Sequence, residues 1–281
     1  MKIIFSRKGF DSAYGGYPSP ILPDNKLISL PIPSNDKISY SELNFNKRNT
    51  YYDLMKNLNS KIKFNGKWFP ITKNTTCHLD PDIFLNIKKR SKDWKPLFGQ
   101  ISAAQTHLTN QNVEVNDIFL FFGWFKKTIY IKNKLFFDQN ESNHGIHIIF
   151  GYFQIGQILN IIDNKKVPKW MEYHPHTCKT RRIISNNTIY IAREKISWDK
   201  NISGAGVFNF NPNLVLTKKG FSRTKWELPL FFKKVNISYH PKNCWKKNYF
   251  QSMARGQEFV TEENEKITKW AMQIINQNVP H

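Results

Sequence analysis

The sequence has few cysteines, no long apolar run and few acidic residues. Its three cysteines, Cys77, Cys178 and Cys244, are widely spaced and odd in number, so they form no disulfide framework and predict a reducing compartment. No apolar stretch approaches the roughly 18–20 residues of a transmembrane helix. The only apolar run near the start, residues 3–5, is too short for a signal peptide. We therefore expect a cytoplasmic protein that does not insert in a membrane.

The motifs of the commonest nucleotide-binding and hydrolytic enzymes are also missing. The chain has no G-x-G-x-x-G, no Walker A sequence, no G-x-S-x-G turn and no H-E-x-x-H. These absences remove the most frequent nucleotide and hydrolase interpretations and leave variant forms open.

The stretch HPHTC is the best candidate for metal binding in the sequence. It places His174, His176 and Cys178 at alternate positions, so in a strand all three would share one face. His144 and His147 lie nearby in the sequence. The paired spacings typical of zinc ligands are missing, however. We therefore interpret the stretch as part of a polar loop over residues 163–182 and assign no metal, and the sequence identifies no cofactor.

What the sequence does contain is enough apolar material for a folded core and a large excess of basic charge. Hydrophobic residues make up 40% and aromatic residues 15% of the 281 residues, which excludes a disordered chain. There are 42 Lys and Arg against 21 Asp and Glu. Between residues 200 and 257 the imbalance reaches eleven basic residues against one acid, Glu227. Such a surface attracts nucleic acid, a nucleotide or another phosphate-rich partner; solubility and non-specific adhesion are the alternatives.

The pattern of apolar residues predicts an α+β fold with a β-rich centre. Residues 115–125 and 145–161 read as strands, and strands with short turns dominate from 113 to 217. Glycines inside these strands indicate bulges and strong curvature, as in a small barrel. Residues 61–71 read as a hairpin turning at Asn65 and Gly66. With no repeat and no convincing linker, we expect a single domain over residues 1–281 with a curved, largely antiparallel, barrel-like core.

The last part of the chain predicts an amphipathic helix over residues 262–276. Thr261 can cap it, and acidic residues in its first turn suit a helix N-terminus. Apolar residues recur at helical spacing along one face. Those residues are Ile267, Trp270, Ala271, Ile274 and Ile275.

The opening stretch, residues 6–33, can be a loose tail, a structural turn or a functional segment. Arg7 and Lys8 could bind phosphate, and Gly9 would allow close approach of the backbone. Asp11 could orient Lys8 or act as an acid or base. Five prolines and a glycine pair favour a fixed path over a loose tail, and an ordered surface loop is the alternative to a functional role.

Two further segments carry candidate site residues. Gln105 and His107 precede the aromatic strand that contains Trp124, and amides with an aromatic platform suit a nucleobase. The alternative is that the aromatic strand is simply core. Arg255 suits a phosphate and Glu258 could act as a base, unless they form a surface ion pair.

Several segments together resemble the nucleotide modification associated domain 3 family. They are SRKGFDSAYGGYPSPILPD, LISLPIP, HLDPD, GQISAAQTHLTNQ, DIFLFFGWF, IFGYFQIG, GFSRTKWELPLFF and RGQEFV, and they span residues 6–260. The resemblance implies an α+β domain linked to modification of nucleic-acid bases, and it transfers no catalytic residue. The residues of this chain within these motifs are Arg7, Lys8, Asp11, His78, Asp80, Asp82, Gln105, His107, Trp124, Arg223, Arg255 and Glu258.

A second resemblance is to PUA-like barrels, including the base-reading EVE and YTH domains. The pair of segments NDIFLFFGWF and IFGYFQIGQIL is similar to two of their strands, although Asn116 replaces the usual glycine. This resemblance implies that a flipped base could sit at the mouth of a barrel.

We therefore expect a protein that acts on or recognises modified bases in DNA or RNA. As an enzyme it would hold phosphate with basic residues, hold the base with Gln105 and Trp124, and move protons with acidic groups or histidine. The phosphate-binding candidates are Arg7, Lys8, Arg223 and Arg255, and the catalytic candidates are Asp11, His107 and Glu258. The alternatives are a non-catalytic base reader and a phage-defence nuclease or transferase. The oligomeric state stays open.

Overall fold

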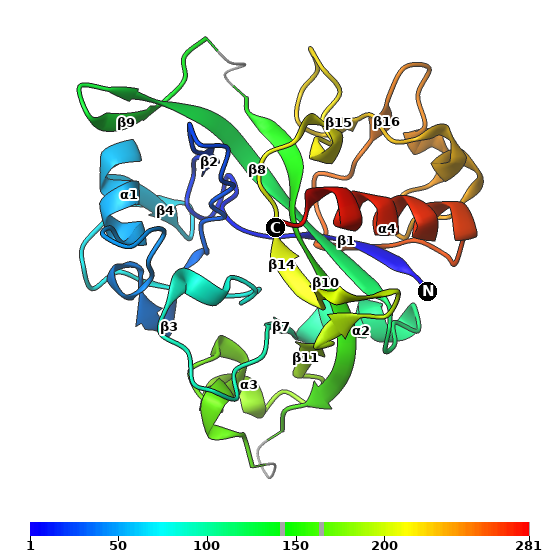
Figure 1. Cartoon of the computed structure of the whole chain (residues 1–281), viewed down its shortest axis with the longest axis horizontal. Helices are drawn as coiled ribbons and strands as arrows, with labels where there is room; N and C mark the ends of the chain where they lie inside the picture. The colour runs from blue at the N-terminus through cyan, green and yellow to red at the C-terminus, as the bar shows by residue number, and fades with distance from the viewer. Residues whose placement is uncertain (141–143, 163–165, 281) are drawn as a thin grey trace.

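The fold is α+β, as expected, and is organised around one large mixed sheet (Figure 1). The computed structural model describes residues 1–140, 144–162 and 166–280. Within these ranges the α-helices are α1 (Tyr51–Leu58), α2 (Ser102–Asn110), α3 (Lys179–Arg182) and α4 (Glu265–Asn278). The strands are β1 (Ile3–Arg7), β2 (Ser19–Ile21), β3 (Pro33–Ser39), β4 (Lys61–Phe64), β5 (Lys67–Pro70), β6 (Thr76–Cys77), β7 (Leu97–Gln100), β8 (Ile118–Ile131), β9 (Lys134–Phe137), β10 (Ile146–Asn160), β11 (Thr188–Ala192), β12 (Lys195–Ile196), β13 (Asp199–Ser203), β14 (Ala205–Val207), β15 (Lys225–Trp226), β16 (Phe250–Gln251) and β17 (Glu258–Val260).

The main sheet follows the order β17-β1-β8-β10-β11-β7, with β2 and β9 on β8 and β14 on β10. The neighbours along this path are antiparallel, except that β1 runs parallel to β8. In Figure 1 the long strands β8 and β10 cross the molecule next to each other. Helix α4 lies beside β1, and α1 packs near β9 on the other side of the view.

The sheet is curved but does not close into the expected barrel. Within the described residues no main-chain ladder joins β7 to β17, the two ends of the path. The ends nevertheless approach, since the Gln100 amide on β7 donates to Glu258 Oε1 on β17 at 2.7 Å. The glycine-based prediction of bulges is confirmed, because the register of β10 shifts near Gly151 and again at Gly156. The sequence therefore predicted the bulges, whereas the described strands form no closed barrel.

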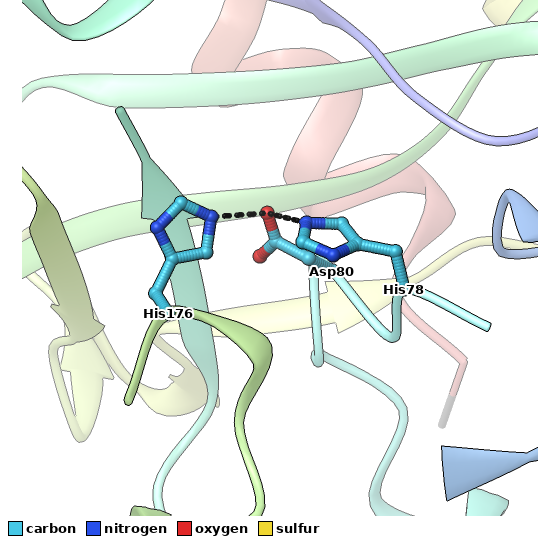
Figure 2. A group of neighbouring side chains, drawn as sticks. All are labelled: His78, Asp80 and His176. Atoms are coloured by element: carbon cyan, nitrogen blue, oxygen red, sulfur yellow. Dashed lines mark ion pairs between the residues drawn. The ribbon is translucent and has the colours of Figure 1, made fainter. Parts of the chain in front are cut away.

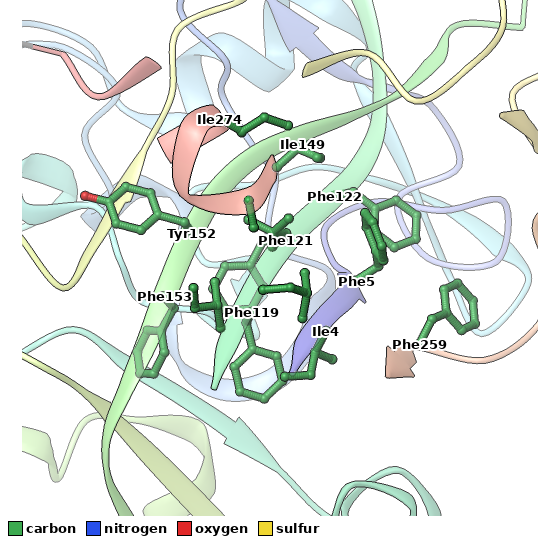
Figure 3. Close-up of a cluster of buried hydrophobic side chains, with 14 of the residues drawn as sticks. Ile4, Phe5, Phe119, Phe121, Phe122, Ile149, Tyr152, Phe153, Phe259 and Ile274 are labelled. Atoms are coloured by element: carbon green, nitrogen blue, oxygen red, sulfur yellow. The ribbon is translucent and has the colours of Figure 1, made fainter. Parts of the chain in front are cut away.

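The main core lies on both faces of this sheet, and α4 covers the face that carries Phe5 (Figure 3). Strand β8 contributes consecutive buried aromatic residues because it is covered on both faces. Phe119 and Phe121 lie on one face, while Phe122 packs against Trp226 with ring centroids 5.0 Å apart. A second group of buried apolar residues surrounds α1.

The opening stretch is a fixed part of the structure and not a loose tail. Phe10, Tyr17, Leu22 and Leu30 are buried and belong to the core around α1. Gly15 has a φ of 83°, and a side chain there would meet the Phe10 ring. The conformational freedom of this glycine thus lets the chain fold back tightly over Phe10.

The predicted C-terminal helix is confirmed as α4, but its cap differs. Asn264 caps it by accepting from the backbone N–H groups of Lys266 and Ile267. Thr261, the expected cap, instead accepts from the N–H of Ile3 at 3.2 Å. Thr261 bonds to the sheet because it directly follows β17, which ends at Val260. The helix therefore begins at Glu265, three residues later than expected.

The predicted hairpin is also confirmed, with Asn65 and Gly66 at positive φ between β4 and β5. The polar loop expected over residues 163–182 lies partly outside the described residues, since 163–165 are not described. Its remainder contains short helical turns, including α3. Among the described helices, none combines the length and the hydropathy required to cross a bilayer.

Candidate functional site

Most of the candidate residues gather around the end of β1. Arg7 is the last residue of this strand, and its guanidinium lies between the rings of Phe122 and Phe259, at 5.7 and 5.6 Å. It donates to the backbone carbonyls of Met253 and Ala254. Burial lowers the pKa of Arg7, and the charge of Arg223 adds to this against the opposing charge of Asp11. Arg7 is thus a partly buried cation that holds the loop before β17.

Lys8 forms a buried ion pair with Glu258. Its ammonium lies 2.8 Å from Glu258 Oε1 and 4.4 Å from the centroid of the Phe98 ring. The Lys8 side chain is 9% exposed and that of Glu258 is 1% exposed. Gln100 donates to the same carboxylate oxygen, and Oε2 is buried without a partner among the described residues. The pair therefore joins β1, β17 and β7 inside the protein.

Arg223 and Trp124 form a half-buried stack next to Arg7. The Arg223 guanidinium lies 4.0 Å from the centre of the Trp124 ring, whose N–H donates to the carbonyl of His144 at 2.7 Å. Burial lowers the pKa of Arg223, and the carboxylate of Asp11 opposes this. Asp11 is exposed, and its Oδ1 accepts the N–H groups of the turn that follows it. The two arginines and Asp11 thus act on one another electrostatically.

The remaining candidates are less closely joined to this group. Gln105 lies on α2 and not on a loop, and its buried amide accepts from the hydroxyl of Tyr190 at 3.0 Å. His107, on the same helix, contacts Ser238 Oγ at 2.9 Å and lies over Tyr239. Burial lowers the pKa of His107, although the charge of Glu258 opposes this. Arg255 is exposed on the loop before β17.

Basic and aromatic side chains alternate on the surface beyond Arg223. The ammonium groups of Lys218 and Lys225 both lie 5.6 Å from the centre of the Phe221 ring. Lys225 also lies 5.2 Å from the ring of Tyr249, which packs near Phe221. We call this surface, with Arg223 and Trp124, the Arg223 surface.

A separate cluster joins His78 and Asp80 to His176, nearly a hundred residues later (Figure 2). Asp80 Oδ2 lies 3.7 Å from His78 Nε2 and 3.9 Å from His176 Nε2, and the three ligand-type atoms all fall within 4.8 Å of one another. His174 Nε2 approaches the other oxygen, Asp80 Oδ1, at 3.4 Å. This is the group of described residues best suited to hold a metal ion.

Strand β7 separates this cluster from the Lys8–Glu258 pair. Phe98 and Gln100 face that pair, whereas a side chain at Gly99 would collide with the His176 ring. The Gly99 N–H donates to Asp80 Oδ1 at 2.8 Å. Glycine at this position therefore allows the His176 ring to lie directly against the strand.

The charges in the cluster are strongly coupled. Burial alone would raise the pKa of Asp80, but the imidazoles of His174 and His78 hold it well below its usual value. Burial lowers the pKa of His176 to about 3 despite the charge of Asp80. Burial likewise acts against a charged His78, but Asp36 and Asp80 outweigh it and raise the pKa of His78.

A cavity of about 740 Å³ reaches Asp80. Its lining includes Gly9, Tyr51 and Phe150, so the opening stretch, α1 and β10 all contribute. The volume falls in the range of about 300–1,000 Å³ that is usual for ligand sites.

The structure divides the residues of HPHTC. His176 belongs to the cluster, His174 supports Asp80, and Cys178 lies next to Thr180 and Arg181. His147 is elsewhere, accepting from the indole N–H of Trp226 at 3.0 Å. Nothing in the local sequence pattern connects His176 with His78 and Asp80. The H-x-D spacing in HLDPD is the available signal. It does not point to His176, because that residue lies nearly a hundred residues later in the chain.

Comparison with known proteins identifies one family. The family model described as nucleotide modification associated domain 3 matches residues 2–262. Neither the curated proteins nor the solved structures gave a match.

Proposed function

Because the chain belongs to the nucleotide modification associated domain 3 family, we propose that it binds nucleic acid and acts on or recognises bases in it. The family description supports a role in nucleotide modification. The finer proposal rests on the residues of the Arg223 surface.

The observation that carries the proposal is the stack of Arg223 on Trp124, at 4.0 Å, within a basic and aromatic surface. Proteins that bind single strands combine cations that follow the phosphates with rings on which bases stack. Each stacked base contributes about 1–3 kcal/mol in favourable cases. Trp124 supplies a ring, Arg223 a planar cation, and the lysines beyond them further positive charge.

The geometry favours different roles for the basic candidates. In our proposal Arg223, which is half-buried, and Arg255, which is exposed, contact phosphates. Arg7 and Lys8 have protein partners in the folded state, with Glu258 closing the pair with Lys8. In our proposal Arg7 and Lys8 do not contact nucleic acid but hold the strands and the loop that carry the surface. Glu258 pairs with Lys8 and transfers no proton.

The enzyme version of the proposal assigns proton transfer to Asp11. Its carboxylate is exposed and lies in the field of two arginines, so it can reach a bound substrate. His107 and Gln105 are placed on the α2 side, where Gln105 is already bonded to Tyr190. In the binding-module version the same surface holds a base and Asp11 is dispensable.

Binding is tested with single-stranded and duplex DNA and RNA, each with plain and modified bases, over a series of salt concentrations. We expect affinity to fall steeply with salt, because binding releases counterions from the phosphates. Arg223→Ala should weaken binding and flatten the salt dependence. Lys269→Ala is the matched control, since Lys269 is an exposed cation on α4 that pairs with Glu265.

Failure to bind any of these polymers at low salt would remove the proposal. Mass spectrometry of nucleosides after incubation then separates enzyme from reader. Altered nucleosides that disappear in Asp11→Asn, with binding retained, support the enzyme version. Selective binding with no product from any substrate supports the reader.

A further inference from the structure

We propose that His78, Asp80 and His176 form a binding site for a divalent first-row transition-metal ion. The three residues offer two imidazole nitrogens and one carboxylate oxygen within 4.8 Å of one another. The proposal does not depend on nucleic-acid binding, because it concerns metal binding by the protein alone.

The hydrogen bonds outside the cluster fix the tautomer of His78. Its Nδ1 lies 2.8 Å from the carboxylate of Asp36, which is itself held by Arg181 and by Ser34 Oγ. A carboxylate accepts, so His78 Nδ1 carries the proton. The Nε2 lone pair then points toward Asp80, as in the carboxylate–histidine pairs that orient metal ligands.

His176 is oriented in the same way by Asn187. The amide nitrogen of Asn187 donates to the carbonyls of Ile161 and His176, so its oxygen faces the ring. That oxygen lies 2.7 Å from His176 Nδ1 and accepts its proton. The Nε2 of His176 is therefore also left as an acceptor that faces Asp80.

Asp80 presents one free oxygen to these two nitrogens. Its Oδ1 accepts from the Gly99 N–H at 2.8 Å, and His174 Nε2 lies 3.4 Å away. His174 Nδ1 accepts from the backbone of His176, so the proton of His174 is on the buried Nε2 that faces Asp80. The remaining oxygen, Oδ2, faces His78 and His176.

With both imidazoles neutral, three acceptor atoms thus converge with no proton between them. Hydrogen bonds cannot explain the arrangement, because contacts of 3.7 and 3.9 Å exceed the usual limit of about 3.2 Å. A second proton on His78 would still be 3.7 Å from its acceptor. Two atoms that bind one ion at about 2.1 Å lie at most about 4.2 Å apart. The distances from Asp80 Oδ2 to the two histidines are within this limit. The Nε2 atoms of His78 and His176 lie within 4.8 Å of each other, so they need to approach by at most roughly 0.6 Å.

The donor set indicates the class of ion. Imidazole suits iron, nickel, copper and zinc, whereas magnesium and calcium prefer oxygen ligands only. Three protein ligands leave coordination positions open, as in catalytic metal sites and not in closed structural ones. A cavity reaches Asp80, although its lining includes neither His78 nor His176.

The test uses the full-length protein, dialysed against a chelator and titrated with Co²⁺. Binding is followed by visible d–d absorption and by calorimetry. We expect about one ion per chain, and a melting temperature that rises with the Co²⁺ concentration because the ion binds the folded state. Mg²⁺ in the same titration should not compete.

Variants locate the ion. His78→Gln and Asp80→Asn should abolish binding, and Asp36→Asn should weaken it by about 10–100-fold through the orientation of His78. His144→Gln is the matched control, since it removes an exposed imidazole outside the cluster. Circular dichroism checks that each variant folds. Should Asp80→Asn fail to fold, His78→Gln and Asp36→Asn decide the question.

Three results would overturn the proposal. They are no Co²⁺ binding by the wild type, unchanged binding in the folded His78→Gln variant, and an equal loss in His144→Gln. Competition by Mg²⁺ at similar concentration would contradict the assignment of the donor set.

Discussion

Replacing Lys8 with methionine should destabilise the protein strongly, because Glu258 would remain buried without its cation. The Glu258 side chain is only 1% exposed, and its Oε1 receives both the Lys8 ammonium and the Gln100 amide. Its Oε2 has no partner among the residues that the structure describes. The carboxylate is therefore unable to turn toward solvent without opening the contact between β7 and β17.

The magnitude follows from the burial of both charges. Removing one partner of a buried ion pair typically costs about 3–5 kcal/mol, because the other charge is left uncompensated. For a chain of this size, about 1 kcal/mol shifts the melting temperature by roughly 2–4 °C. Lys8→Met should thus lower it by roughly 6–20 °C. The double variant Lys8→Met/Glu258→Gln should recover much of this loss, because no charge remains buried.

The assay is urea and thermal unfolding of the wild type, the two single variants and the double variant. A loss below about 1 kcal/mol for Lys8→Met would refute the argument, since that is the range of solvent-exposed pairs. A double variant less stable than Lys8→Met would refute it as well. Either result, together with weakened nucleic-acid binding, would return Lys8 to the role of a phosphate ligand.

Three further predictions concern other parts of the structure. Trp124→Ala should weaken binding of single strands by about 1–3 kcal/mol per lost stack, measured by fluorescence titration against Trp124→Phe, which should retain most of the affinity. Asn264→Ala should lower the free energy of unfolding by about 1 kcal/mol, measured by urea unfolding, because it removes the cap of α4. Burial, with the charges of Arg7 and Arg223, holds the pKa of His147 well below its usual value. The unfolded chain therefore takes up a proton there below about pH 6.5 while the folded chain does not, so stability falls by up to about 2 kcal/mol between pH 7 and 5. Unfolding curves at the two pH values should show a smaller difference in His147→Gln; an equal difference would contradict this.

Much of the fold could be predicted because it depends on local patterns. The aromatic run of β8, the hairpin at Asn65 and Gly66, and the apolar face of α4 each follow from neighbouring residues. The bulges in β10 were visible as glycines inside a strand. Closure of the sheet was not predictable, because it depends on whether β7 and β17 form a ladder, and they meet only through side chains.

The candidate site was predicted in part. The sequence indicated a basic and aromatic region, and the fold brings Arg7, Asp11 and Arg223 close enough to act on one another, with Arg223 over Trp124. It did not reveal that Lys8 and Glu258, which are 250 residues apart, form a pair. Each charge taken alone is compatible with a surface role, so the sequence gives no sign of the pair.

Composition and short-range pattern determined the basic charge, the apolar core and most elements, because these depend on residue type and on spacing within one strand or helix. Only the tertiary structure decided which polar groups meet. It placed Asp80 against the edge of β7, with His78 on one side and His176 on the other (Figure 2). The physical reason is that a site of three acceptors needs ångström-scale convergence of distant segments, and that convergence is set by packing against Gly99 and by the partners Asp36 and Asn187.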